Sequence, residues 1–322
     1  MTISYTQPLT SAWRRMTVAL FKPFDLVKWM VLGFTAFLAG LTKSSGNLGG
    51  RGFSRNLGYK LKDFGELLAL PILIWDWLQV HSGWFALIIF GILLLIALGV
   101  VLLWLSARGR FMFLDNVVHD RAVVKQPWHE FKREGDSLFA WELVFLLIVL
   151  LMVILFMVQA YYSARNIYFE AKFPPQLLLP IIGLVILGLL SGLLFAYISV
   201  FLHNFVVPIM YRDRITATQA WRRFLSLFAN RWGHFLLYGL FWFGLHIVAI
   251  MAIALAGLLT CCIGFLLLII PYIGSVITLP ISYTFTALGP EFLAQFGSEY
   301  DIFHRHEPAT VASENSPSME NS

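Results

Sequence analysis

Charged residues are scarce in this chain. Only 13% of its 322 residues are Asp, Glu, Lys or Arg, whereas 59% are apolar. So few charges cannot cover the surface of a water-soluble domain, and the composition therefore excludes an ordinary soluble protein. Lipid is the solvent that the sequence indicates.

Cysteine is nearly absent as well. The two cysteines, Cys261 and Cys262, are adjacent in "LLTCCIGFL". Neighbouring cysteines rarely bridge to each other, because their geometry is unfavourable. We therefore expect neither a disulfide framework nor a cysteine metal site, and we interpret the pair as small packing residues in a helical hairpin.

Catalytic signatures are also missing. The sequence contains no phosphate-binding loop, no H-E-x-x-H, no nucleophile elbow and no close run of His and carboxylates suited to a metal. We therefore expect a protein that is not an enzyme and that has no cofactor. Its basic loops carry aromatic residues, but a membrane surface explains them more simply than nucleic acid does.

Long apolar runs, in contrast, are abundant. A membrane-spanning helix needs about 20 apolar residues, and six segments meet this requirement, which predicts an all-α integral membrane protein with six transmembrane helices. They lie near residues 24–41, 84–105, 140–162, 178–202, 235–259 and 265–289.

The first of these segments is the weakest, since it is short and contains Asp25 and Lys28. A cleaved signal peptide is the alternative. The polar region before it is long and contains Pro8 and Pro23, which is typical of an interfacial helix rather than of a short basic leader. We therefore favour a transmembrane helix.

Cations are divided unevenly between the two sides of the membrane. With six spans, both termini and the loops at 106–139 and 203–234 share one side, which carries fifteen Lys and Arg residues against seven on the other. The fifteen are Arg14, Arg15, Lys22, Arg108, Arg110, Arg121, Lys125, Lys132, Arg133, Arg212, Arg214, Arg222, Arg223, Arg231 and Arg305. Because cytoplasmic loops collect Lys and Arg, we predict a multi-pass protein of the cell inner membrane with both termini in the cytoplasm.

Three stretches outside the spans have their own character. Residues 42–63 are rich in Gly, Ser and Asn, and residues 306–322 form a polar tail on the cytoplasmic side. Both compositions predict disorder. Residues 64–83 are apolar but interrupted by charged residues and proline, which predicts a helix in the outer interface, with a re-entrant element as the alternative.

One motif recurs in the two long cytoplasmic loops. "DRAVVKQPW" begins at Asp120 and "DRITATQAW" at Asp213, so that four positions of D-R-x4-Q-x-W match at a constant offset of 93. The N-terminal "TSAWRRM" shares its Trp-Arg-Arg with the later "QAWRRF". Fixed spacing argues against coincidence. We predict three repeats, at about 5–105, 113–203 and 205–289, within a membrane domain of residues 1–305.

Each repeat is predicted to be an amphipathic helix at the cytoplasmic interface followed by two spans. In the first copy Leu9, Trp13, Met16 and Leu20 recur at helical spacing on one face. Such a helix seats its aromatic side chains below the headgroups and its Arg side chains among the phosphates. We therefore predict binding to the lipid bilayer and its anionic phospholipid headgroups through Trp13, Arg14, Arg15, Trp128, Trp221, Arg222 and Arg223.

The last repeat resembles a known kind of membrane domain. Its helix "TQAWRRFLSLFANRWGHFLLYGL" and its span pair with the tight turn "LLTCCIGFLLLIIPYIG" are similar to the membrane domain associated with some glycerophosphodiester phosphodiesterases and to related uncharacterised multi-pass bacterial proteins. The resemblance implies a membrane domain only, because the chemistry of those enzymes belongs to a separate α/β barrel. No polar segment here approaches the roughly 250 residues of a barrel, so no catalytic residue is carried over.

His246 is the ionisable residue that lies well inside a confident span. An intramembrane His suggests a proton relay or a wet cavity. We favour a neutral imidazole bonded to a neighbouring helix, since no second acid or His accompanies it within the spans. Pro271, Gly274 and Pro280 interrupt the sixth span, as in the broken helices of transporters or in kinked helices that pack closely.

These features predict a non-enzymatic scaffold or accessory protein that acts at the cytoplasmic lipid surface. A membrane-protein partner or a homo-oligomer would suit this role. The alternative is a small-solute or lipid transporter, which predicts a polar lining around His246. A membrane-embedded enzyme would need a cluster of acids or His at one depth, and the sequence shows none.

Overall fold

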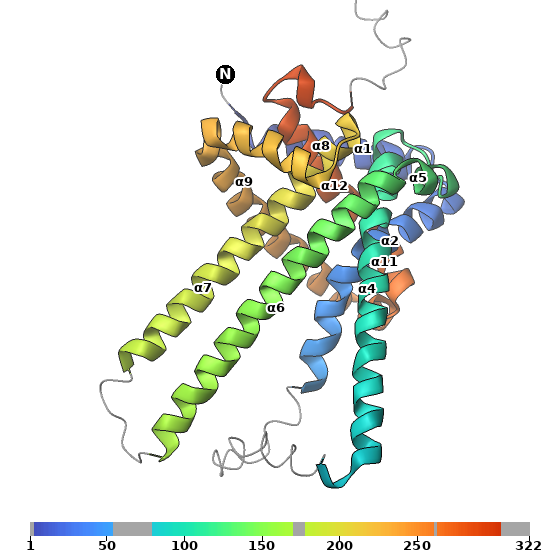
Figure 1. The fold of residues 1–322 in the computed structure, drawn as a ribbon. Helices are drawn as coiled ribbons and strands as arrows, with labels where there is room; N and C mark the ends of the chain where they lie inside the picture. The colour runs from blue at the N-terminus through green and yellow to red at the C-terminus, as the bar shows by residue number, and fades with distance from the viewer. Residues whose placement is uncertain (1–2, 54–78, 170–177, 261–262, 304–322) are drawn as a thin grey trace, which may run out of the picture. The chain divides into compact units, whose positions relative to one another are not determined.

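Every regular element that the structure describes is a helix (Figure 1). The structure is a computed structural model, and it describes residues 3–53, 79–169, 178–260 and 263–303. The absence of strands from these residues confirms the all-α class. The predictions for the tail, for the Cys261–Cys262 turn and for most of residues 64–83 fall outside the described residues.

Four stretches are long and apolar enough to cross a membrane, namely Gly83–Val118, Lys132–Ser163, Ile182–Asp213 and Ala217–Leu259. They lie in α4 (Ser82–Val118), α6 (Lys132–Phe169), α7 (Leu178–Phe201) with the π-helix η2 (Leu202–Val206) and α8 (Val207–Asp213), and α9 (Ala217–Leu259). The remaining helices are α1 (Thr6–Phe21), α2 (Leu26–Phe53), α5 (Lys125–Glu130), α10 (Ile263–Ile269), α11 (Pro271–Ile277), α12 (Leu279–Ala294) and the 3-10 helix η3 (Ser298–Tyr300). The structure thus supports a helical membrane protein.

The other two predicted spans look different. The apolar part of α2, Leu26–Thr42, is shorter than the four long stretches. The segment predicted at 265–289 is divided among α10, α11 and α12. Proline has no N–H and disfavours the helical conformation in the residue before it, and Ile270 before Pro271 is accordingly extended. The interruption expected from the prolines is therefore present.

The chain divides into two compact units. The first unit comprises residues 1–39, 108–135 and 201–322, and the second comprises residues 40–107 and 136–200. We describe each by itself.

The first unit has an aromatic core. Phe205, Phe224, Phe235, Tyr238 and Phe292 are each no more than 1% exposed. The ring of Phe205 lies 4.8 Å from that of Tyr238 and 5.3 Å from that of Phe224, centroid to centroid. Offset and edge-to-face aromatic pairs at these distances add to the burial itself. The core joins η2, α9 and α12, and α1 packs along α12.

The π-helix η2 has a local cause. Pro208 lacks the N–H that would bond to the carbonyl of Asn204 in a regular α-helix. On the neighbouring α12, a Cβ placed at Gly289 would lie 2.2 Å from the Asn204 carbonyl oxygen. Only glycine permits this approach. The Asn204 side chain accepts a hydrogen bond from the Tyr238 hydroxyl at 3.2 Å, within the same buried layer.

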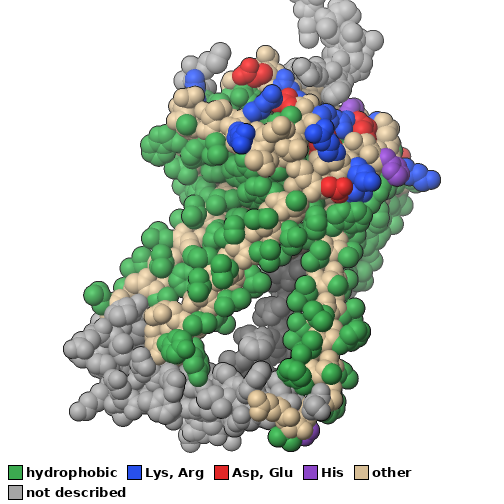
Figure 2. Space-filling view, viewed as in Figure 1, with side chains coloured by type: hydrophobic (Ala, Val, Ile, Leu, Met, Phe, Trp, Pro, Cys, Tyr) green, Lys and Arg blue, Asp and Glu red, His purple; other side chains and the backbone are tan. Residues whose placement is uncertain are grey.

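The second unit buries few of its apolar side chains, and in this respect it is like the apolar part of α9, where Ile247 is 60% exposed. Its helices expose large apolar residues along their length, including Leu95 at 68%, Leu151 at 58% and Leu189 at 70% (Figure 2). Phe145 and Phe195 form a T-shaped pair at 5.6 Å, and the Trp104 indole N–H donates to Asp136 at 3.0 Å. Apolar exposure on this scale is typical of helices that face lipid.

Candidate functional site

A cluster of polar side chains in the first unit lies where α4 ends. Asp120 adopts a left-handed conformation with φ 49°, which stops the helix and which Asp tolerates better than most residues. The Asn116 side chain then closes the following loop, because it donates to the Val123 carbonyl and accepts from the Val123 N–H, each at 3.0 Å. This loop positions the residues that surround Asp115.

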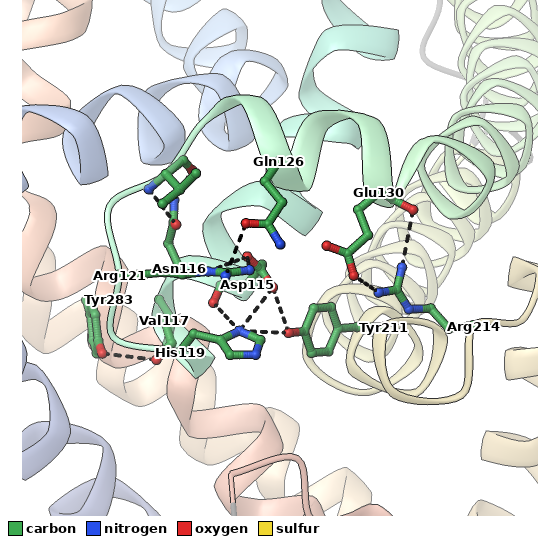
Figure 3. A network of polar contacts seen from close by, with 11 residues as sticks. Asp115, Asn116, Val117, His119, Arg121, Gln126, Glu130, Tyr211, Arg214 and Tyr283 are labelled. Atoms are coloured by element: carbon green, nitrogen blue, oxygen red, sulfur yellow. Dashed lines mark hydrogen bonds and ion pairs between the residues drawn. The ribbon is translucent and has the colours of Figure 1, made fainter. Parts of the chain in front are cut away.

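Asp115 is the centre of a buried polar network (Figure 3). Its side chain is 1% exposed. One carboxylate oxygen accepts from Arg121 Nη2 at 2.7 Å, and the other accepts from the Tyr211 hydroxyl of α8 at 2.9 Å. His119 Nδ1 lies 3.1 Å from Asp115 Oδ1 and 3.4 Å from the Tyr211 hydroxyl. A buried carboxylate is tolerated only with such partners.

A second pair lies beside this network. Arg214 ends α8 in a left-handed conformation with φ 54°. Its guanidinium donates to the carboxylate of Glu130 and, at 3.2 Å, to the Glu130 carbonyl (Figure 3). It also lies 3.8 Å above the ring of Phe131, a cation–π contact. Arg214 therefore fastens the end of α8 to α5.

Two further contacts tie this loop to distant parts of the chain. The Tyr283 hydroxyl of α12 donates to the Val117 carbonyl at 3.2 Å, and Lys28 of α2 bonds to Asp120 at 2.9 Å. Asp115 already accepts hydrogen bonds from Arg121 and Tyr211 and is closed to solvent. We therefore interpret the contacts around Asp115 as ones that hold segments of the chain together, and we call them the clasp. Among the described residues, no group of three or more His, Cys, Asp and Glu could hold a metal ion.

Residues of the recurring motif take part in the clasp. Arg121 and Arg214, which occupy the same motif position, both form ion pairs at a turn before a helix. Asp120 pairs with Lys28, and Asp213 pairs with Arg223. The motif therefore has a role in folding, in addition to the membrane contact that the sequence suggests.

The predicted interfacial residues of α1 divide between exposed and internal positions. Trp13 is 57% exposed and Arg14 is exposed. Arg15 instead bonds to Glu291 at 2.5 Å and lies 4.1 Å from the ring of Phe303. The buried stripe of α1 consists of Pro8, Ala12, Met16, Ala19 and Leu20. Met16 and Leu20 of the predicted apolar face are therefore buried against the protein, whereas Trp13 is exposed, and its membrane contact stays a prediction.

The corresponding residues of α9 are also partly exposed. Arg222 is exposed, Arg223 pairs with Asp213, and Trp221 is half-buried against Phe224 at 5.8 Å. Arg231 has non-helical φ and ψ. The helix is therefore kinked at Arg231, before its long apolar part.

The middle helix, α5, differs from the other two. It is only six residues long, and Trp128 is half-buried, 5.1 Å below the guanidinium of Arg108. Pro127 and Phe131 are buried. Trp128 therefore contacts the protein on one side, and its place in the headgroup layer stays a prediction.

His246 lies between two aromatic rings of the first unit. Its ring centroid is 3.6 Å from that of Trp242 and 4.1 Å from that of Phe285 on α12. Its Nδ1 lies 3.2 Å from the Trp242 carbonyl, one helical turn earlier. The sequence favoured an imidazole bonded to a neighbouring helix, whereas the carbonyl beside Nδ1 belongs to α9 itself and the contact with α12 is the ring of Phe285.

Sequence reasoning missed the centre of the clasp. Asp115, Asn116, His119 and Tyr211 were not singled out. A signal was present in "FLDNVVHDR", where Asp and Asn follow an apolar run just before the motif. Polar residues at the end of a span are inexpensive to solvate, so that their burial could not be read from the sequence.

The chain belongs to a family of unknown function (DUF7544), which matches residues 4–295. No curated protein and no solved structure matches it. The family match covers nearly all of the described helices, and the family has no assigned function. It provides no link to glycerophosphodiester phosphodiesterases.

Proposed function

We propose that the protein is a non-enzymatic membrane scaffold that acts at the cytoplasmic lipid surface. In this proposal it contains six spans in three repeats, and α1, α5 and the first half of α9 are the cytoplasmic helices. Both termini lie in the cytoplasm of a cell whose inner membrane holds the protein. The resemblance of the last repeat to the membrane domain of glycerophosphodiester phosphodiesterases is part of the same hypothesis.

One observation carries the scaffold proposal: polar contacts join the three proposed repeats pairwise. Lys28 and Asp120 link the first to the second, and Asp115 and Tyr211 link the second to the third. Arg15 of the first also bonds to Glu291, which lies two residues beyond the end of the third. Side chains that hold the segments together suit a rigid scaffold. Buried or half-buried ion pairs specify how the segments are arranged more than they add to stability.

A transporter for a small solute or a lipid is the second candidate. The division of the sixth segment into α10, α11 and α12 favours it, because broken helices free backbone groups for a substrate. The aromatic neighbours of His246 favour the scaffold, since a proton pathway needs water beside the imidazole.

The lipid contact is tested by replacing two exposed arginines. Each Lys or Arg near an anionic leaflet contributes on the order of 1 kcal/mol, reduced by salt screening. We expect Arg14→Gln with Arg222→Gln to lower the retention of phosphatidylglycerol by the detergent-purified chain about three- to tenfold, as counted by native mass spectrometry.

The control is phosphatidylcholine, whose retention should not change. The variant Arg15→Gln should have a smaller effect on phosphatidylglycerol, because Arg15 is already paired with Glu291. Equal losses of both lipids would contradict the proposal that these arginines bind lipid charge.

The orientation rests on the uneven distribution of cations and is tested separately. In a chain with both cysteines replaced, single cysteines introduced at Lys125 and at Lys43 are labelled in intact cells with an impermeant maleimide. We expect label at position 43 and none at position 125 until the membrane is opened. The reverse result would place the basic helices on the outer face.

A further inference from the structure

Exposed cations are concentrated on α5 and the first turn of α6. Lys125 and His129 lie one helical turn apart on α5, and Lys132 and Arg133 follow at the start of α6. All four are exposed. Figure 2 shows Lys, Arg and His side chains gathered where Figure 1 places α5. We name these four residues the basic patch.

Acidic residues near the patch do not neutralise it. Glu130 is engaged by Arg214, and Glu134 is buried. Lys132 and Arg133 also stand at a helix N-terminus, where the helix dipole disfavours cations. Their charge therefore does not serve the stability of α6.

The patch lacks the apolar side chains that would insert it into lipid. No large apolar side chain is exposed in residues 108–135, whereas α1 exposes Trp13 and Phe21 and α9 exposes Leu225. An interfacial helix needs an apolar face as well as cations. The basic patch therefore differs in kind from the other two cytoplasmic helices.

The length of α6 leads to the same conclusion. Val144 is the first large apolar side chain exposed on this helix, eleven residues after Arg133. Eleven residues of α-helix rise about 16 Å, and about 13 Å if the helix tilts by about 40°. The headgroup layer on one side of a bilayer is about 5–8 Å deep. If α6 spans the membrane, the patch extends beyond the headgroups into water.

We infer that the basic patch is a docking surface for an acidic segment of a partner protein. This inference rests on the proposed scaffold function and gives it a partner. Charge complementarity selects an acidic partner. A nucleic acid would use exposed aromatic rings as stacking platforms, and Trp128, the aromatic residue of α5, is held against Arg108.

The experiment uses the full chain in nanodiscs of neutral phosphatidylcholine, with a fluorescent deca-glutamate peptide as the probe at low salt. The patch variant carries Lys125→Gln, Lys132→Gln and Arg133→Gln. The matched control removes three exposed cations elsewhere, by Arg14→Gln, Lys22→Gln and Arg222→Gln. We expect the Kd for the peptide to rise about five- to thirtyfold in the patch variant and less than twofold in the control.

A charge-reversal variant distinguishes loss of the patch from misfolding. The variant Lys125→Glu, Lys132→Glu and Arg133→Glu should lose the deca-glutamate peptide and gain binding of a deca-lysine peptide, which an unfolded surface would not predict. Equal losses in the patch and control variants, or no binding by the natural chain, would overturn the inference. So would a patch variant that loses single-stranded DNA but retains the peptide.

The outcome of the lipid experiment is independent of the outcome of the peptide experiment. If Arg14→Gln with Arg222→Gln leaves phosphatidylglycerol retention unchanged while the patch variant loses the peptide, the lipid part of the proposed function is wrong and the docking surface stands. If the patch variant loses phosphatidylglycerol instead of the peptide, the patch binds headgroups and the inference is wrong.

Discussion

The two compact units bury the same apolar residue types to different extents. The aromatic core of the first unit buries Phe205 and Phe235 completely, although the apolar part of α9 in that unit exposes Ile247 at 60%; the second unit exposes Phe90 at 68% and Leu95 at 68% and buries few apolar side chains. Burial from water drives the packing of apolar side chains only where water is the alternative. In lipid that drive is absent, and close packing and polar contacts decide how helices associate. In the first unit, where side chains are buried around an aromatic core, Asp115 is buried as well and needs the partners of the clasp.

The largest expected difference between the units comes from removing one aromatic ring. Phe205→Ala should lower the free energy of unfolding by about 3–5 kcal/mol, because it leaves a cavity among rings that are already in contact. Phe90→Ala removes the same atoms from an exposed position and should cost less than about 1 kcal/mol. SDS titration of both variants in bicelles measures the difference. Similar costs would show that the comparison between the units is false.

A smaller effect is expected from removing one hydroxyl. Tyr211→Phe deletes the hydrogen bond to Asp115, and hydrogen bonds to charged groups contribute about 1.5–3 kcal/mol. Tyr162→Phe makes the same change at a side chain that is 54% exposed in the second unit, and should stay within about 0.5 kcal/mol. The same titration compares them. If Tyr211→Phe leaves the free energy of unfolding unchanged, the clasp does not hold α8.

The smallest effect is expected at His246. Gln keeps a group that can hydrogen-bond to the Trp242 carbonyl of the same helix, and side-chain hydrogen bonds within membranes average about 0.6 kcal/mol, so His246→Gln should change the free energy of unfolding by less than about 1 kcal/mol. Neither His246→Gln nor His246→Leu should create a pH dependence. Liposome flux of protons or solute that varies with pH and that both variants abolish would favour the transporter instead.

Several features of the fold were predictable from residue types alone. The apolar runs predicted the long helices α4, α6, α7 and α9, because about 20 apolar residues have few alternatives to a helix in lipid. Pro271 and Pro280 predicted the breaks around α11 through the missing N–H and the restricted preceding residue.

The candidate site was less predictable. Trp13 is exposed while Ala12 is buried. This difference depends on the close contact between α1 and α12, which the periodicity of the sequence does not reveal. The sequence assigned Arg15 and Trp128 to the headgroups but did not predict their contacts with Glu291 and Arg108. Each of these contacts joins residues that are distant in the sequence.

The sequence by itself determined the class of protein, the helices and the places where they break, since these follow from local hydrophobicity and from the covalent geometry of proline. Only the tertiary structure decided which polar residues face inward. Asp115 meets Tyr211 across 96 positions of sequence, and Arg15 meets Glu291 across 276. Such pairs form because a charge removed from water needs a partner. Which partner is within reach depends on how distant helices pack, and no local pattern records that.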